Sequence, residues 1–196
     1  MMIKRLLLLI VVLALLIPSR SVEAQLGPRE EIPFVPTPVE VIDRMLELAE
    51  VKKGDVVYDL GSGDDRIVIR AAKKYRVKAI GIEMDQLLLA KARKDAKTAG
   101  VSHLVEFRAE DALKADISRA TVVTLYMLPW FNEAMKPSFQ KYLKPGTRIV
   151  AHDFGIEGWE PDKTVKLPGF ELKAGGYKHQ HVIYLWRMNE KRVSQR

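Results

Sequence analysis

Three groups of glycine and acidic residues are spaced along the chain in a way that suits the binding of a nucleoside. Residues 59–66 read Asp-Leu-Gly-Ser-Gly-Asp-Asp-Arg, where glycines let the backbone approach a ligand and a following helix would offer free N–H groups. Glu83 follows this turn by about 20 residues, the distance at which an acidic side chain accepts hydrogen bonds from ribose hydroxyls. Glu110 and Asp111 provide a carboxylate that would accept a hydrogen bond from an adenine amino group.

Two other interpretations of the glycine turn remain open at this point. A nicotinamide dehydrogenase would carry a third glycine where Arg66 stands, and a guanidinium there would crowd the approach of the helix. Alternatively, the glycines only form a turn and the acids are surface residues. The spacing of all three groups favours a nucleoside site over either.

The elements that must position these groups alternate between strand and helix. This alternation predicts an α/β domain with a Rossmann-like, doubly wound, mostly parallel seven-stranded sheet, whose ligand crevice lies at the carboxyl ends of the strands. A hairpin joined around Gly175-Gly176 is expected to close the sheet as an antiparallel pair. The first expected helix begins at Thr37 or Pro38, and three further helices are expected over residues 66–75, 85–99 and 130–142. The expected strands are 55–60, 77–83, 104–109, 121–126, 147–153, 165–173 and 181–188.

From about Pro33 to Asp162 the chain resembles the class I S-adenosylmethionine methyltransferases. It is most similar to the small lysine methyltransferases of the ATP synthase c-subunit and the adenine nucleotide translocase, with their bacterial relatives. The glycine turn is common to the superfamily, whereas residues 33–37, 126–129 and 159–162 are more specific. The resemblance implies S-adenosyl-L-methionine as cofactor, held by Thr37, Asp59, Gly61, Ser62, Gly63, Asp64, Arg66, Glu83 and Asp111.

One residue departs from the family pattern, because Asp65 stands where the turn usually ends in glycine. Asp tolerates a positive φ better than most residues, so we expect a backbone cost of about 1 kcal/mol. Its charge would also repel the carboxylate of the cofactor.

The resemblance implies methyl transfer to a protein lysine, which must be neutral to attack. At pH 7 only about one lysine in 2,500 is neutral, and an apolar channel would lower its pKa by desolvation. The expected catalytic residues, as channel walls, are Tyr126, Pro129, Trp130 and Trp159, with Phe154 beside them. The alternative for Tyr126 and Phe154 is core packing, and the alternative for Trp159 is that it covers the edge of the sheet. A small-molecule or lipid acceptor is the second interpretation, and an exported nucleoside-binding module without catalysis is the third.

The N-terminal sequence is typical of a secretory signal peptide. Lys4-Arg5 precedes an apolar run of about 12 residues, and Val22-Glu23-Ala24 resembles a cleavage site. Residues 1–24 are therefore expected to be a signal peptide or, less simply, a membrane anchor, followed by a proline-rich segment (25–38), the methyltransferase domain (39–188) and a polar tail (189–196). The domain is then exported or membrane-anchored, although its cofactor is made in the cytosol, which keeps a cytoplasmic-side function open.

Composition excludes some chemistry. The chain has 196 residues, enough for one α/β domain, and no cysteine, so thiolate metal sites and cysteine nucleophiles are excluded. The formal net charge is +7, but no basic cluster is interleaved with aromatic residues, so no nucleic-acid partner is expected. His179 and His181 alternate without a further ligand at a supporting spacing, so no metal site is expected.

Overall fold

A single mixed sheet organises the domain, with strand order β3-β2-β1-β4-β5-β9-β6. The first five strands along the chain pair in parallel, whereas β9 is antiparallel to both of its neighbours. This is the predicted doubly wound sheet, with one refinement: the last strand enters between β5 and β6. Its strands are β1 (Val56–Leu60), β2 (Lys78–Glu83), β3 (Val105–Ala109), β4 (Val122–Leu125), β5 (Arg148–His152), β6 (Lys163–Lys166) and β9 (Val182–Arg187).

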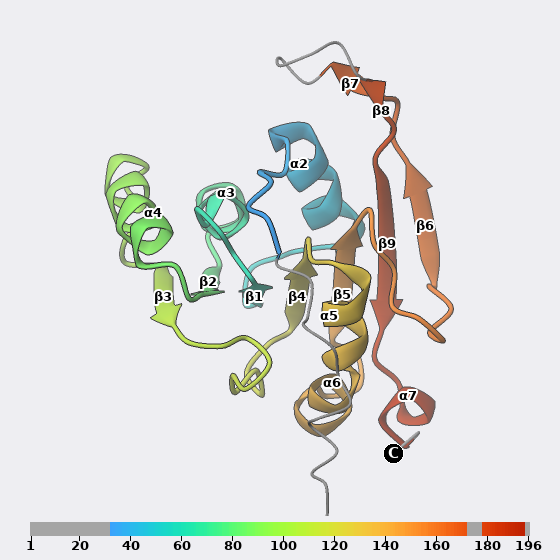
Figure 1. The fold of residues 1–196 in the computed structure, drawn as a ribbon. Helices are drawn as coiled ribbons and strands as arrows, with labels where there is room; N and C mark the ends of the chain where they lie inside the picture. The colour runs from blue at the N-terminus through green and yellow to red at the C-terminus, as the bar shows by residue number, and fades with distance from the viewer. Residues whose placement is uncertain (1–31, 172–177, 195–196) are drawn as a thin grey trace, which may run out of the picture. The chain divides into compact units, whose positions relative to one another are not determined.

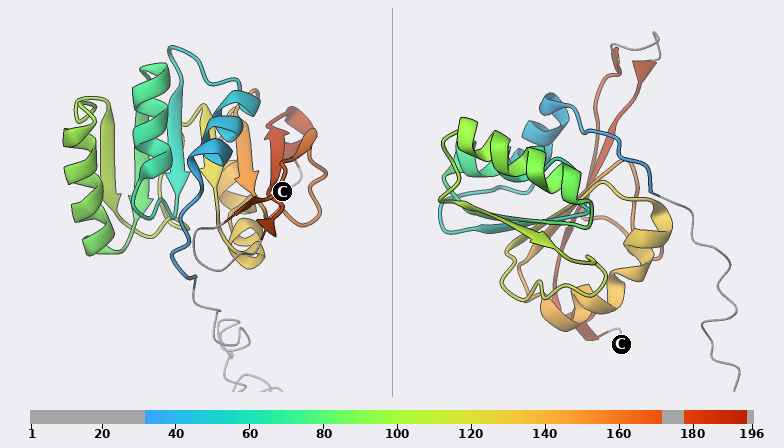
Figure 2. Two further views of the ribbon diagram at one scale, coloured as in Figure 1. Left: turned by 90° about the horizontal axis from the view of Figure 1, so that it is seen from above. Right: turned by 60° about the vertical axis from the view of Figure 1, so that its left-hand side comes forward.

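Helices cover both faces of this sheet, as Figures 1 and 2 show. One face carries α2 (Val39–Leu48), α3 (Arg66–Tyr75) and α4 (Gln86–Thr98), and the other carries α5 (Pro129–Ala134) and α6 (Lys136–Tyr142). Because the central strands are covered on both sides, they are buried along their length and mostly apolar rather than alternating. All residues of β4 and β5 are buried, whereas edge strand β3 is partly exposed.

Local sequence accounts for where the helices begin and end. Asp85 caps α4, its side chain accepting hydrogen bonds from two amides of the first turn, and Gly100 follows the helix with a φ of +71°. The helix expected over residues 130–142 is two helices, separated at Met135. Pro137 explains the separation, because its ring has no N–H for the carbonyl of Glu133 and would clash with it in a continuous helix.

The C-terminal region differs from the expectation in two further ways. The long strand expected from 165 to 173 is instead β6 and a two-residue strand, β7 (Phe170–Glu171), which pairs with β8 (Lys178–His179). A short helix, α7 (Glu190–Ser194), lies in the segment expected to be a polar tail.

The computed structural model describes residues 32–171 and 178–194, and the sheet and helices belong to one compact unit that starts at Phe34. The expected signal peptide, most of the proline-rich segment and the turn at Gly175-Gly176 lie outside the described residues. Within the described ranges, every helix is too short or too polar to span a membrane.

Candidate active site

The glycine turn, residues 61–65, connects the end of β1 to the end of β2 through backbone hydrogen bonds. The amides of Gly61 and Ser62 both donate to the carbonyl of Ile82, at 2.9 and 3.0 Å. The amide of Gly63 donates to Oε2 of Glu83 at 2.9 Å. Two of the groups that lie 20 residues apart in the sequence are therefore joined by a direct hydrogen bond.

Glu83 shapes the backbone around it through both carboxylate oxygens. Its Oε1 accepts from the amides of Met84 (2.7 Å) and Asp85 (2.8 Å), while Oε2 accepts from Gly63. An ionised carboxylate has about four acceptor positions, so three are used and one remains for a ligand hydroxyl. Glu83 thus builds the turn and can still face a ligand.

Gly61 and Gly63 both have positive φ, +73° and +58°, and both are in close contact with another segment. A Cβ at Gly61 would lie 2.3 Å from the sulfur of Met127, and one at Gly63 would lie 2.6 Å from the ring of Phe34. Met127 follows β4, and Phe34 belongs to the proline-rich segment. The turn therefore needs glycine for its backbone and for the two side chains that cover it.

Asp64 is held by two cations and is a structural part of the turn. Arg66 donates to both of its oxygens at 2.8 Å, and the ammonium of Lys91 lies 3.0 Å from Oδ2. Burial would raise the pKa of Asp64, but these hydrogen bonds outweigh it and the pKa lies below its usual range. Arg66 also donates to the carbonyl of Thr37 at 3.3 Å, which ties the turn to the start of α2.

Two buried carboxyl groups lie under the turn. Burial raises the pKa of Asp59 to about 7, against the opposing hydrogen bond from the Thr124 hydroxyl at 2.6 Å. Burial likewise raises the pKa of Asp65 to about 8, and the neighbouring negative charges add to the effect. Asp65 is completely buried, with a φ of +59°, so the expected left-handed conformation is confirmed.

Asp65 points onto the backbone of β2. A Cβ on Gly81 would lie 1.5 Å from Oδ1 of Asp65, so Gly81 provides the space that the carboxyl occupies. With a pKa of about 8, Asp65 is mostly uncharged at neutral pH. The repulsion of a cofactor carboxylate expected from the sequence would therefore act at full strength only above that pH.

The end of β3 supplies the third acidic group. Oδ1 of Asp111 accepts from the amide of Leu113 at 3.0 Å, and its Oδ2 lies 3.6 Å from the ammonium of Lys114. Because β3 pairs in parallel with β2, Asp111 follows the strand next to the one that ends in Glu83. Asp111 is one-third exposed, which leaves it accessible to a ligand.

The start of α3 adds hydrogen-bond donors to this edge. Asp65 occupies the N-cap position, but its side chain makes no capping hydrogen bond. The first amides of a ten-residue helix therefore face the turn without a side-chain cap, where a helix dipole favours an anionic group such as a carboxylate.

Aromatic side chains line the neighbouring edge, after β4 and β5. The ring of Tyr126 lies 4.0 Å from that of His152 and stacks at 6.3 Å on Phe154. Burial and the charge of Asp153 raise the pKa of Tyr126. Thr37 is buried here too, its hydroxyl 3.4 Å from Nδ1 of His152.

The other expected channel residues differ in their surroundings. Pro129 is exposed at the first position of α5, and the ring of Trp130 packs edge-on against Phe131 at 5.8 Å. Trp159 is 7% exposed and lies 6.3 Å from the ring of Phe139 in α6. These contacts of Trp159 are those of a packing residue, whereas Tyr126 lies beside the strand ends.

Several residues at this edge were not identified from the sequence. Met127 and Gly81 contribute through close contacts with residues distant in sequence, for which periodicity gives no signal. His181 comes beside His152 because β9 pairs with β5. Spacing along the chain gives no sign of this neighbour, because the two residues belong to different strands.

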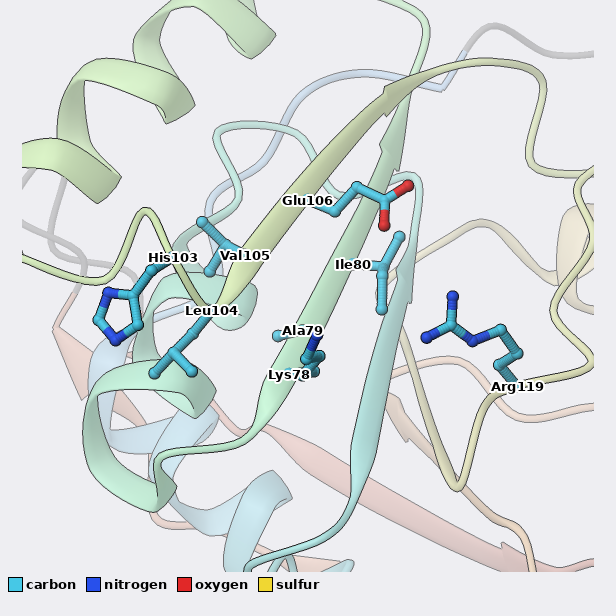
Figure 3. Close-up of a pocket in the computed structure, with 8 residues that line it drawn as sticks. All are labelled: Lys78, Ala79, Ile80, His103, Leu104, Val105, Glu106 and Arg119. Atoms are coloured by element: carbon cyan, nitrogen blue, oxygen red, sulfur yellow. The ribbon is translucent and has the colours of Figure 1, made fainter.

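A shallow pocket lies at the opposite end of the same strands (Figure 3). It is lined by the first residues of β2 and β3, together with His103 and Arg119. Ligands of doubly wound sheets bind at the carboxyl ends of the strands, so this pocket is separate from the candidate site.

Comparison with known proteins identifies the family to which this chain belongs. The family model for the ANTKMT methyltransferase domain matches residues 59–163. A protein-lysine N-methyltransferase of Saccharolobus islandicus is 41% identical over 160 residues, 81% of this chain and 95% of that protein. The lysine N-methyltransferase of the ATP synthase c-subunit from Xenopus laevis is 32% identical over 67% of this chain, which spans only 57% of that protein.

A solved structure extends the comparison to three dimensions. An RNA methyltransferase from Salinibacter ruber, in complex with S-adenosyl-L-homocysteine, is 52% identical with a TM-score of 0.71. The match covers 80% of this chain and 95% of that one. From the family model and these relatives, the chain belongs to the ANTKMT methyltransferase domain family.

Proposed function

We propose that this protein transfers a methyl group from S-adenosylmethionine to a lysine side chain of a protein substrate. The observation that carries the proposal is the hydrogen bond from the Gly63 amide to Glu83, which assembles the glycine turn and the acidic end of β2 into one site. We propose lysine as the acceptor because the Saccharolobus relative, 41% identical over most of both chains, is a protein-lysine N-methyltransferase.

The residues present fit such a cofactor. One of its ribose hydroxyls would donate to the remaining acceptor position of Glu83, and its adenine amino group would donate to Asp111. The uncapped start of α3 suits its carboxylate. The cofactor supplies an activated methyl group on a sulfonium, whose positive charge the acidic strand ends favour.

The protein's own contribution is alignment and desolvation of the acceptor. Tyr126 and Phe154 offer stacked aromatic faces after β4 and β5, next to the proposed cofactor edge. A lysine that packs against these rings loses hydration, which lowers the pKa of its ammonium and raises the neutral fraction. An in-line displacement then needs only the correct distance and angle.

The experiment must distinguish a protein substrate from an RNA substrate, because the Salinibacter relative is described as an RNA methyltransferase. The full chain is incubated with cell extract and S-adenosylmethionine carrying a tritiated methyl group, and the labelled products are treated with protease or ribonuclease. We expect protease-sensitive label that mass spectrometry assigns to methyllysine. Ribonuclease-sensitive label would replace lysine with RNA as substrate, and label confined to a solvent extract would indicate a small molecule or lipid.

Matched variants make the assay specific to the site. Glu83→Ala should lower labelling about 10- to 100-fold when S-adenosylmethionine is present below its Kd, whereas Glu106→Ala, near the opposite end of the strands, should retain it. Equal labelling by both variants would place the active site elsewhere.

Export or membrane association through residues 1–24 stays a prediction from the sequence. N-terminal sequencing of the protein from its native host distinguishes the two forms of this prediction: an N-terminus at Gln25 indicates a cleaved signal peptide, whereas an intact Met1 rejects cleavage after Ala24 and leaves the membrane anchor.

A further inference from the structure

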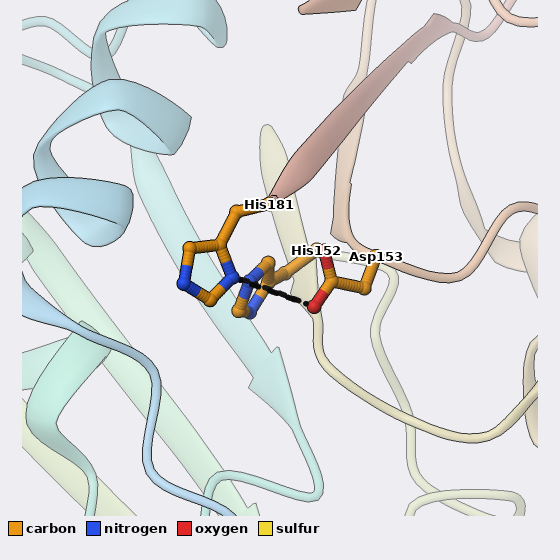
Figure 4. A group of neighbouring side chains, drawn as sticks. All are labelled: His152, Asp153 and His181. Carbon is orange, nitrogen blue, oxygen red and sulfur yellow. Dashed lines mark hydrogen bonds and ion pairs between the residues drawn. The ribbon is translucent and has the colours of Figure 1, made fainter. Parts of the chain in front are cut away.

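A compact group of two histidines and one aspartate lies where β5 meets β9 (Figure 4). His152 is the last residue of β5, Asp153 follows it, and His181 precedes β9. All three side chains are at least nine-tenths buried. The antiparallel pairing of the two strands brings together residues separated by almost 30 positions.

One atom from each side chain points at a common centre. His152 Nε2 lies 2.8 Å from His181 Nδ1 and 3.2 Å from Oδ2 of Asp153, and the last two atoms are 3.5 Å apart. Nitrogen and oxygen ligands about 2.0–2.1 Å from a tetrahedral ion are separated from one another by about 3.3 Å. The Asp153 oxygen lies at about this distance from both nitrogens, whereas the two nitrogens are hydrogen-bonded to each other at 2.8 Å and would have to separate by about 0.5 Å around an ion.

Outer contacts hold two of the three side chains, those of His152 and Asp153. The second ring nitrogen of His152 lies 3.4 Å from the hydroxyl of Thr37, and a polar partner on the second nitrogen helps to orient an imidazole whose first nitrogen binds a metal. Oδ1 of Asp153 accepts from the amide of Val182 at 2.9 Å, which directs Oδ2 toward the imidazoles.

Asp153 holds this position in a strained backbone conformation. Its φ is +59°, and its amide donates to the carbonyl of Val182 at 2.7 Å. A non-glycine residue in this region is strained, and such strain concentrates at functional sites. The backbone pairing with Val182 therefore maintains a carboxylate direction that the chain would not adopt freely.

We propose that His152, Asp153 and His181 bind one divalent transition-metal ion. Two imidazoles and one carboxylate suit zinc, iron, cobalt or nickel, whereas magnesium and calcium prefer sites built from oxygen alone. Three protein ligands leave a coordination position open. The ion would join the end of β5 to the start of β9, next to Tyr126, whose ring makes a tilted contact with that of His152 at 4.0 Å.

The test is metal binding by the full chain after treatment with a chelator. We expect Zn²⁺ to raise Tm by about 5–10 °C at a concentration about 100-fold above its Kd, and Mg²⁺ to leave Tm unchanged. Co²⁺ should give the visible absorption bands of a nitrogen- and oxygen-ligated ion at one ion per chain. Absence of both the Zn²⁺ shift and the Co²⁺ bands would overturn the proposal.

Variants of similar shape assign the ligands. Asp153→Asn tolerates the same backbone conformation and keeps an oxygen for Val182, and His181→Gln retains most of the side-chain volume; both should lose the Zn²⁺ shift. His103→Gln, which changes an exposed histidine at the start of β3, should keep it. If all three variants responded like the wild type, the ion would bind elsewhere and the proposal would fail. If the two ligand variants did not fold, the Co²⁺ spectrum of the wild-type protein would still decide.

Discussion

The buried carboxyl of Asp65 should make the stability of this protein fall as the pH rises. Its pKa in the folded state is about 8, against 3.8 as its ordinary value. Between these values the unfolded chain has released a proton that the folded chain retains, so unfolding is favoured as the pH increases. The stabilisation is complete below about pH 4 and is lost as the pH passes through about 8.

The magnitude follows from the shift. One pH unit inside this window corresponds to a little over 1 kcal/mol, so the three units from pH 5 to pH 8 amount to about 4 kcal/mol. This value is an upper limit, because a local opening would let water reach the carboxylate. Asp65→Asn keeps the shape and tolerates the φ of +59° but has no proton to release.

Urea unfolding of both proteins at pH 5, 6, 7 and 8 measures the effect. The free energy of unfolding of Asp65→Asn, minus that of the wild type, should increase with pH by up to about 4 kcal/mol. Asp59 is present in both proteins, so its own titration largely cancels in the difference. Glu157→Gln, which removes an exposed acid, should follow the wild type. A difference that stays constant with pH would refute the burial of an ionisable Asp65.

Three further predictions follow from individual contacts. Gly81→Ala should destabilise the protein by about 1–3 kcal/mol because its Cβ meets the carboxyl of Asp65, and Asp65→Gly in the same chain should relieve most of this loss in a double-mutant cycle of urea unfolding. Asp55→Ala should cost about 3–5 kcal/mol in the same assay, because it leaves the buried guanidinium of Arg148 without its ion-pair partner. Tyr126→Ala should lower kcat/KM for methyl transfer about 10- to 100-fold while Tyr126→Phe retains most of it, since the aromatic face rather than the hydroxyl lines the acceptor edge.

The sheet and the acidic residues at the strand ends could be predicted from the sequence, because both depend on local signals. The alternation of strands and helices around the glycine turn predicted β1 and β2 to within one residue, and α3 agrees with the expected bounds at both ends. The position of Glu83 at the end of β2, beside the end of β1, followed from the parallel pairing that this alternation requires. The hydrogen bond to Gly63 is a direct consequence of that register.

The remaining features depend on contacts between distant segments, for which the sequence contains no local pattern. The insertion of β9 between β5 and β6 brings His181 beside His152, although the two are 29 residues apart. The fit between Asp65 and Gly81 similarly requires the three-dimensional packing of the turn on β2. The break at Met135 could have been expected, because Pro137 lies inside the apolar pattern of the helix.

Calorimetric titration of the full chain with S-adenosylhomocysteine tests the central claim most directly. We expect one binding site per chain, with affinity lowered by about 1–3 kcal/mol in Glu83→Ala and in Asp111→Ala, and unchanged in Glu106→Ala at the far end of β3. No binding by folded protein, or equal affinity in all three variants, would contradict a cofactor site at the carboxyl edge of β1, β2 and β3.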